Sequence, residues 1–327
     1  MRDNDSATAT VTIAVSTPDA PDTAAPENRQ PAKAPQLPEA ASGAARGALL
    51  AALGVAAFSL TFPATAWALE GMGPWTVVML RSVLATVLAG GALAVFRGRL
   101  PERRHWAGIA VVTGGVVLGF PLLTTLALQT STTSHAAVVV GLLPLTTAAF
   151  SAVRTGARPS RTFWIASLVG AVVVIGFAVQ QSGGAPGRGD LLLFGSLLVC
   201  AAGYTEGGRL ARHMPGWQVM GWALVLALPV TVTGAAVALS AEPLRLTVHS
   251  VGGVLWLAFG SQFLGMVAWY RGMAAIGISK ASQLQLAQPL LTLLWSVLLL
   301  GERLPPAAPA AALAVLACIA VTQRTRG

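Results

Sequence analysis

Apolar residues fill long continuous blocks of this chain, and polar residues gather in the short segments between the blocks. A block of about 20 apolar residues can cross the hydrocarbon core of a bilayer as a helix. Membrane strands would alternate with a period of two, and these blocks do not alternate. Since lipid admits only helices and closed barrels, the pattern predicts membrane helices. The ten predicted helices cover Ala45–Glu70, Pro74–Phe96, His105–Leu128, Ser134–Val153, Phe163–Val179, Gly189–Leu210, Gly216–Ala241, Ser250–Tyr270, Ser279–Leu300 and Pro306–Thr322.

The composition leads to the same fold class, an all-α integral membrane protein. Hydrophobic residues make up 54% of the chain and charged residues only 10%. A soluble domain has about 25% charged residues, and one with so few could not cover its surface. The lipid bilayer is therefore an expected partner of this chain.

A short motif occurs once in each half of the chain. An ungapped alignment of Gly141–Pro144 with Leu286–Pro289 also places Thr147 on Thr292. Five helices per half is an odd number, so the second half would enter the membrane upside down. Inverted repeats are typical of transporters, whose site lies where the repeats meet. We expect repeats over residues 45–180 and 189–322.

The net charge of +9 does not indicate nucleic acid, because the cations are spread over short loops and form no single face. Alternate loops are rich in arginine, and the remaining loops hold few cations, each close to an acid. This asymmetry follows the positive-inside rule and predicts a cytoplasmic membrane protein with both termini in the cytoplasm. The rich set is Arg97, Arg99, Arg103, Arg104, Arg154, Arg158, Arg161, Arg209, Arg212, Arg271, Lys280, Arg324 and Arg326.

The two ends of the chain are expected to lie outside the helices. Residues 1–43 contain almost no large apolar side chains and are rich in Ala, Pro, Thr and Asp. Such a segment cannot bury enough surface to fold, so we predict a disordered cytoplasmic tail. Residues 323–327 form a short second cytoplasmic tail.

The chain resembles the EamA-type members of the drug/metabolite transporter superfamily. The resemblance rests on Gln288–Trp295, which begins with the Pro289 motif, and on Leu300–Leu304, which contains Gly301 and Glu302. Pro144 and Arg81 match further positions of that family's pattern. The first half departs from it, because no Gly-Glu follows its proline run. The resemblance implies a ten-helix transporter of small solutes and leaves the substrate open.

Arg81 is the first candidate for substrate binding, because a charge at membrane depth is costly and usually functional. Its guanidinium could hold a substrate carboxylate or phosphate with two parallel hydrogen bonds. The alternatives are a structural ion pair with Glu70 or Glu302, or a side chain that reaches the headgroups.

Polar side chains on one face of the ninth predicted helix form the second candidate. Gln285, Gln288, Thr292 and Ser296 share this face, whereas Gln283 lies off it. Amides donate and accept hydrogen bonds at once and so suit amino-acid-like substrates. The alternative is hydrogen bonding between helices. The weaker substrate-binding candidates are Thr147, Gln262 and Tyr270.

Two residues are candidates for energy coupling. Glu206 lies inside a predicted helix, where it is either a proton-coupling carboxylate or an ion pair with Arg209 three residues later. His135 could titrate near neutral pH, although we expect it at the outer surface. Proton antiport and uncoupled facilitated diffusion both remain open.

The chain has no nucleotide-binding, hydrolase or metal-ligand motif, so we expect no cofactor, no metal and no enzyme activity. We predict a transporter that exports amino acids or related metabolites by alternating access. A broad-specificity drug efflux transporter is the alternative, followed by a membrane-embedded transferase or a passive channel. A small molecule is the expected substrate, and the oligomeric state stays open, a monomer included.

Overall fold

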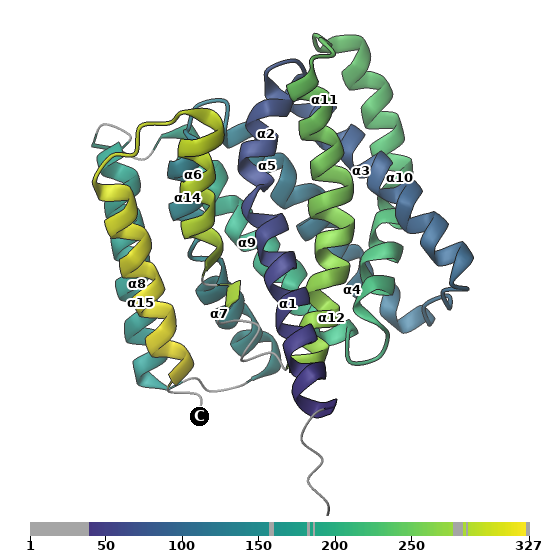
Figure 1. Ribbon diagram of the computed structural model, residues 1–327, viewed down its shortest axis with the longest axis horizontal. Coiled ribbons are helices and arrows are strands. Elements are labelled where there is room, and N and C mark those ends of the chain that lie inside the picture. The colour runs from purple at the N-terminus through teal and green to yellow at the C-terminus, as the bar shows by residue number, and fades with distance from the viewer. Residues whose placement is uncertain are drawn as a thin grey trace, which may run out of the picture. The chain divides into compact units, whose positions relative to one another are not determined.

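The computed structural model describes residues 39–156, 160–181, 184–185, 187–276, 284–285 and 287–324. Within these ranges every regular element is a helix, as Figure 1 shows. The α-helices are α1 (Glu39–Ser59), α2 (Thr61–Leu69), α3 (Pro74–Val95), α4 (Trp106–Val112), α5 (Phe120–Ala127), α6 (Thr133–Val140), α7 (Leu143–Thr155), α8 (Arg161–Gln181), α9 (Arg188–Leu210), α10 (Gly216–Ala241), α11 (Val248–Leu255), α12 (Met266–Ile276), α14 (Ala287–Leu300) and α15 (Ala307–Arg324). The others are the 3₁₀-helix η1 (Arg103–His105) and the π-helices η2 (Thr113–Gly119) and η3 (Trp256–Gly265).

In the described ranges, eight helical segments are long and apolar enough to cross a membrane, and they correspond to the first eight predicted helices. The ninth and tenth correspond to α14 and α15, whose apolar stretches are shorter. The predicted start of the ninth helix, at residues 279–283, lies outside the described residues. Ten membrane helices thus remain a prediction.

The chain ends differ in part from the prediction. Helix α1 begins at Glu39, before the expected end of the tail at residue 43, and residues 1–38 lie outside the described residues. Helix α15 continues to Arg324, two residues past its predicted end. The disordered tail itself stays a prediction.

Several spans are interrupted helices, and prolines account for the interruptions in two of them. The first span breaks at Leu60, between α1 and α2, three residues before Pro63. The fourth breaks at Gly141–Leu142, and Pro144 follows in the first turn of α7. Because proline lacks an N–H, it leaves the carbonyl four residues earlier without its helical partner. These breaks deprive backbone oxygens within the membrane region of their helical partners.

Two other spans contain a π-helical segment each. The offset that aligns Pro144 with Pro289 places the residues of η2 on residues 258–264, which lie inside η3. Such wide turns are rare and often mark functional sites. Their equivalent positions add to the similarity between the two halves of the chain.

Helices from the two halves pack against one another in pairs. Helix α3 packs along α10, α8 along α15 and α6 against α14, and these are the second and seventh, fifth and tenth, and fourth and ninth predicted helices. Likewise α1 packs along α12, while α9 packs against the α4–η2–α5 span. Each of the three pairs joins helices that hold the same position in their halves.

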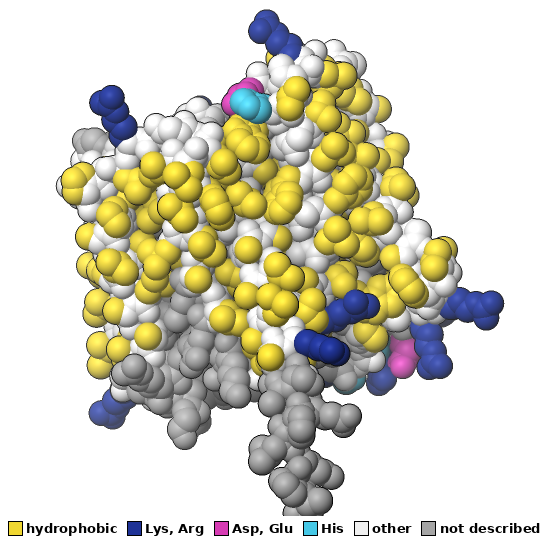
Figure 2. Space-filling model, in the orientation of Figure 1, with side chains coloured by type: hydrophobic (Ala, Val, Ile, Leu, Met, Phe, Trp, Pro, Cys, Tyr) yellow, Lys and Arg dark blue, Asp and Glu magenta, His cyan; other side chains and the backbone are white. Residues whose placement is uncertain are grey.

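The flank of the helices is apolar, as a lipid-facing surface requires. Figure 2 shows hydrophobic side chains over the middle of one face, with most of its charged side chains toward the two ends. Leu168, Val172 and Leu298 are among the large apolar residues that are more than half exposed. We call the end with Glu70, Glu242 and Glu302 the carboxylate end, and the other, with Arg99 and Arg154, the arginine end.

Candidate functional site

A pocket lies between the two copies of the repeated motif. Its lining includes Pro144 at the start of α7 and Pro289 in the first turn of α14, and its cavity volume in this conformation is about 30 Å³. The α6 face formed by Ala137, Val140 and Gly141 lines one side. The remaining lining residues are Phe62, Leu143, Gln285, Gln288, Thr292 and Leu316. The two motifs, distant in sequence, thus share one cavity.

Three of the four polar side chains predicted to share a face meet in this pocket. They are Gln285, Gln288 and Thr292, whereas Ser296 is buried and donates to the Leu293 carbonyl. No residue in the described ranges hydrogen-bonds the side-chain amide of either glutamine. As far as the described residues go, both amides therefore have donors and acceptors available for a ligand. Gln283 lies outside the described residues.

Thr292 joins the pocket to the break in the first span. Its hydroxyl lies 2.9 Å from the Ser59 carbonyl and 3.0 Å from the Gln288 carbonyl. The Ser59 oxygen is the one that Pro63 leaves without a helical N–H. The Ser59 hydroxyl also accepts from the Trp295 indole N–H at 2.9 Å. Hydrogen bonding between helices, one of the two predicted roles of this face, is therefore present at Thr292.

Proline also frees oxygens at the pocket itself. Pro144 removes the helical partner of the Val140 carbonyl, and Pro289 removes that of Gln285. Val140 and Gln285 both line the pocket. The pocket thus combines two amides with the helix break at Gly141–Leu142, and discontinuous helices of this kind line the substrate sites of many transporters.

Arg81 lies in a second polar cluster, between α3 and η3. The Arg81 side chain is buried and donates from Nε to Gln262 Oε1 at 2.9 Å and from Nη2 to the Leu257 carbonyl at 3.4 Å. Gln262 in turn donates weakly to Ser82 at 3.5 Å. Among the described residues no carboxylate lies within 4.0 Å of the guanidinium. Arg81 is therefore a buried charge whose protein partners are neutral.

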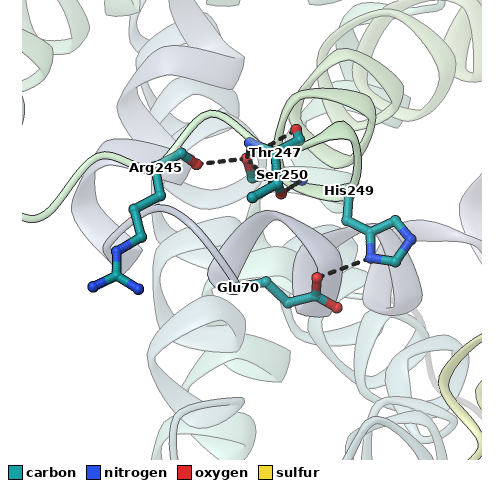
Figure 3. Close-up of polar contacts among 5 residues, drawn as sticks. All are labelled: Glu70, Arg245, Thr247, His249 and Ser250. Atoms are coloured by element: carbon teal, nitrogen blue, oxygen red, sulfur yellow. Dashed lines mark hydrogen bonds and ion pairs between the residues drawn. The ribbon is translucent and has the colours of Figure 1, made fainter.

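The two carboxylates proposed as ion-pair partners of Arg81 have other contacts. Glu70 pairs with His249 at 2.9 Å on the exposed rim (Figure 3). Glu302 accepts backbone N–H groups of Thr133 and Ser134 at 2.8 and 3.0 Å. The prediction that Arg81 forms a structural ion pair with either acid is thus wrong.

The break between α1 and α2 lies between the pocket and the Arg81 cluster. Thr61 hydrogen-bonds Ser261 on η3 at 2.8 Å, and Ser261 is the neighbour of Gln262 in sequence. On the other side, Ser59 contacts α14 and Phe62 lines the pocket. A movement of this break would therefore affect both polar clusters.

Glu302, named in the sequence as part of a motif, caps a helix from the other half. Helix α14 ends at Leu300 and is followed by Gly301, whose φ of +65° suits glycine, and the Glu302 N–H then bonds the Ser296 carbonyl. This turn aims the Glu302 carboxylate at the first N–H groups of α6. Glu242, just after α10, caps α3 in the same way through Trp75 and Thr76 N–H at 3.2 and 2.8 Å. Sequence reasoning missed the role of Glu242.

Glu206 forms the predicted ion pair and a second one. Its two carboxylate oxygens lie 2.7 Å from Arg209 Nε and 2.8 Å from Arg154 Nε. Arg154 comes from the last turn of α7, so the carboxylate joins α7 to α9 at the arginine end. Both contacts have the geometry of charge-assisted hydrogen bonds. The ion-pair alternative is thus confirmed.

His135 is buried, and the expectation of a surface position is wrong. Its Nε2 lies 2.6 Å from Asp190 Oδ1, and its ring stacks on Phe177 with centroids 5.4 Å apart. The side chains of His135 and Asp190 are 8% and 1% exposed. Asp190 also accepts the Gly187 N–H at the start of α9. Asp190 was not a predicted site residue, because its partner is 55 residues away in sequence.

The last two candidates lie outside the pocket lining. The Thr147 hydroxyl is buried in α7 without a hydrogen-bond partner in the described ranges. The Tyr270 ring packs closely over Gly216 at the start of α10, near the arginine end. Thr147 remains a candidate for a ligand contact, whereas Tyr270 has a packing role in this conformation.

Comparisons with known proteins agree with this architecture. The EamA-like transporter family model matches the chain twice, over residues 45–179 and 187–323. The uncharacterized transporter YdeK of Bacillus subtilis (strain 168) is 43% identical over 275 residues, which cover 83% of this chain and 95% of that protein. A solved structure described only as "Crystal structure of protein" has a TM-score of 0.62, with 84% of this chain and 97% of that chain covered. Its identity is 20%, so it shows similarity of fold alone.

Proposed function

The chain belongs to the EamA-like transporter family, and from this premise we propose that it exports amino acids or related small metabolites by alternating access. The pocket between the two repeated motifs carries the proposal. It lies where the two matched domains meet, and it contains two amides without protein partners in the described ranges. Amides at this position can hold the amino and carboxyl groups of one solute together.

The helix caps support an inverted relation between the two domains. Glu302 follows the end of α14 and caps the start of α6, so the ninth and fourth predicted helices, which contain them, run in opposite directions. Glu242 relates the end of α10 to the start of α3 in the same way. We propose ten membrane helices in two inverted sets of five, with α14 and α15 as the last two. Rocking of one set against the other would expose the pocket to each side in turn.

The charges of the loops support a particular orientation of the protein in the membrane. Under the positive-inside rule, the arginine end lies in the cytoplasm and the carboxylate end outside. Both chain termini then lie in the cytoplasm of a cytoplasmic membrane protein, as predicted. The Glu206 ion pairs join α7 and α9 at the cytoplasmic end, where they would stabilise the closed state of that side.

The buried position of Arg81 supports the proposal that the transported solute carries an anionic group. Burial of an unpaired guanidinium costs several kcal/mol, and neutral oxygens offset only part of it. A carboxylate or phosphate that reaches Arg81 would complete this pairing. The α1–α2 break separates Arg81 from the pocket in this conformation, so we propose that the break moves during the transport cycle.

A ligand screen tests the substrate class. Purified protein is heated with each of the standard amino acids and with a set of cationic drugs, since a ligand of the native state raises the melting temperature. We expect shifts with amino acids that are lost in Gln288→Leu and kept in Gln181→Leu, an exposed control. Shifts with drugs alone would favour drug efflux, which the apolar part of the lining would suit.

A further inference from the structure

Helix α6 lies between the pocket and a buried pair of titratable side chains. Ala137, Val140 and Gly141 face the pocket, whereas His135 faces Asp190 on α9 and Phe177 on α8. The helix has only eight residues and ends at the Gly141–Leu142 break. Because α6 is short and ends at this break, we expect a displacement of His135 to be transmitted along the helix to its pocket face.

We propose that His135 and Asp190 form the proton-binding site that couples external pH to this pocket. The proposal rests on the proposed carrier function and supplies the coupling ion, which that function leaves open. A proton from water adds to the imidazole of His135, whose Nε2 hydrogen-bonds the Asp190 carboxylate, and the site gains one positive charge. The same proton leaves to water when the transporter changes conformation.

The surroundings suit a site that loads from the carboxylate end. His135 and Asp190 are buried, yet residues 129, 130 and 132 in the adjacent loop are exposed. Imidazole is the side chain whose charge ordinarily changes between pH 5 and 8. A titratable pair within a membrane span is expensive to retain and usually marks an ion pathway.

In the part of the chain that the structure describes, few charged groups lie at the carboxylate end of the elements packed around α6. Glu302, after α14, caps the helix, and Arg188 lies two residues before Asp190 on α9. Glu70, at the end of α2, pairs with His249, and Arg303, in the loop before α15, is exposed. Helix α8 contributes the Phe177 ring. His135 is therefore the titratable group on α6 through which external pH would act.

The Glu70–His249 pair provides a matched control. It is a second histidine–carboxylate pair at the carboxylate end, and Figure 3 shows it beside the Thr247–Ser250 cap of α11. The side chain of His249 is 57% exposed and that of Glu70 is 48% exposed. An exposed pair is well solvated, so its titration should not move a membrane helix.

Cysteine labelling tests the proposal without a known substrate. In a Cys200→Ala, Cys318→Ala background, Ala137→Cys reports the pocket and Gln129→Cys corrects for reagent chemistry. Sealed vesicles of known orientation are treated from the carboxylate side with an impermeant methanethiosulfonate while external pH varies from about 5.5 to about 8. We expect corrected labelling to change at least about fivefold, the lower range for coupled sites.

Substitutions in the two histidine–carboxylate pairs show whether the pH response of labelling depends on His135 and Asp190. His135→Gln and Asp190→Asn should each make labelling independent of pH, and His249→Gln should keep the wild-type response. Asp190→Asn preserves a hydrogen-bond acceptor, so it covers the case in which His135→Gln does not fold. A flat wild-type profile, or a wild-type response in both site variants, would overturn the proposal. Because no solute is added, an error in the proposed substrate class leaves this result unaffected.

Discussion

Replacing Arg81 by methionine should preserve the fold and weaken the binding and transport of an anionic solute. The guanidinium is buried and has one short hydrogen bond, to Gln262, and one long one, to the Leu257 carbonyl. A hydrogen bond to a charged group contributes about 1.5–3 kcal/mol, and the 3.4 Å contact contributes less. The burial penalty of an ion is several kcal/mol. On these magnitudes Arg81→Met leaves the free energy of unfolding unchanged or raises it by about 1–3 kcal/mol.

The assay compares ligand-free melting temperature with uptake by proteoliposomes. We expect Arg81→Met to melt at or above the wild-type temperature while affinity for an anionic solute falls about ten- to a hundredfold, the loss of one charge-assisted contact. Arg81→Lys keeps the charge without the planar fork and should also lose affinity. In Arg81→Met, the Gln262 side-chain amide loses the hydrogen-bond donor that Arg81 supplied. The double variant Arg81→Met, Gln262→Leu removes this amide as well and so controls for the loss. A lower melting temperature of the double variant with unchanged affinity would refute the reasoning.

Three further predictions concern the carboxylate end and the arginine end of the protein. Glu302→Ala should lower the melting temperature, because it removes a cap of α6 worth about 1 kcal/mol, and Glu302→Gln should recover part of the loss. Glu206→Gln should leave the pH dependence of transport unchanged, because Arg154 holds this carboxylate as a structural partner; a flattened pH profile would reassign it to coupling. A cysteine introduced at Ala185 should react with an impermeant thiol reagent from outside and one at Arg99 should not, and the opposite pattern would reverse the proposed orientation.

The sequence predicted the features that depend on local pattern. Apolar blocks located the spans to within a few residues, because the length and continuity of a block determine whether it can cross lipid. The repeated motif predicted a site where the two halves meet, and Gln285 and Gln288, which were assigned to one face, both line the pocket between the two copies of the motif. The Glu206–Arg209 pair followed from its three-residue spacing.

Contacts between distant segments were not predictable in this way. Glu302 and the N-terminus of α6 are 169 residues apart, and no local pattern relates them. His135 appeared to be a surface residue because it opens a predicted helix, whereas the packing of α9 and α8 buries it. The π-helices η2 and η3 depend on how neighbouring helices pack. Gly115 of η2, for example, approaches α9 so closely that a Cβ atom would meet the Val199 carbonyl.

Counterflow in proteoliposomes tests the central claim most directly, namely that the pocket between the Pro144 and Pro289 motifs binds the transported solute. Vesicles loaded with unlabelled amino acids receive the same amino acids in labelled form, and initial uptake is measured against concentration. We expect saturable uptake by the wild type, a raised KM in Gln285→Leu and Gln288→Leu, and wild-type kinetics in Gln181→Leu. Uptake that rises linearly without saturation, or glutamine variants with unchanged KM, would contradict this claim.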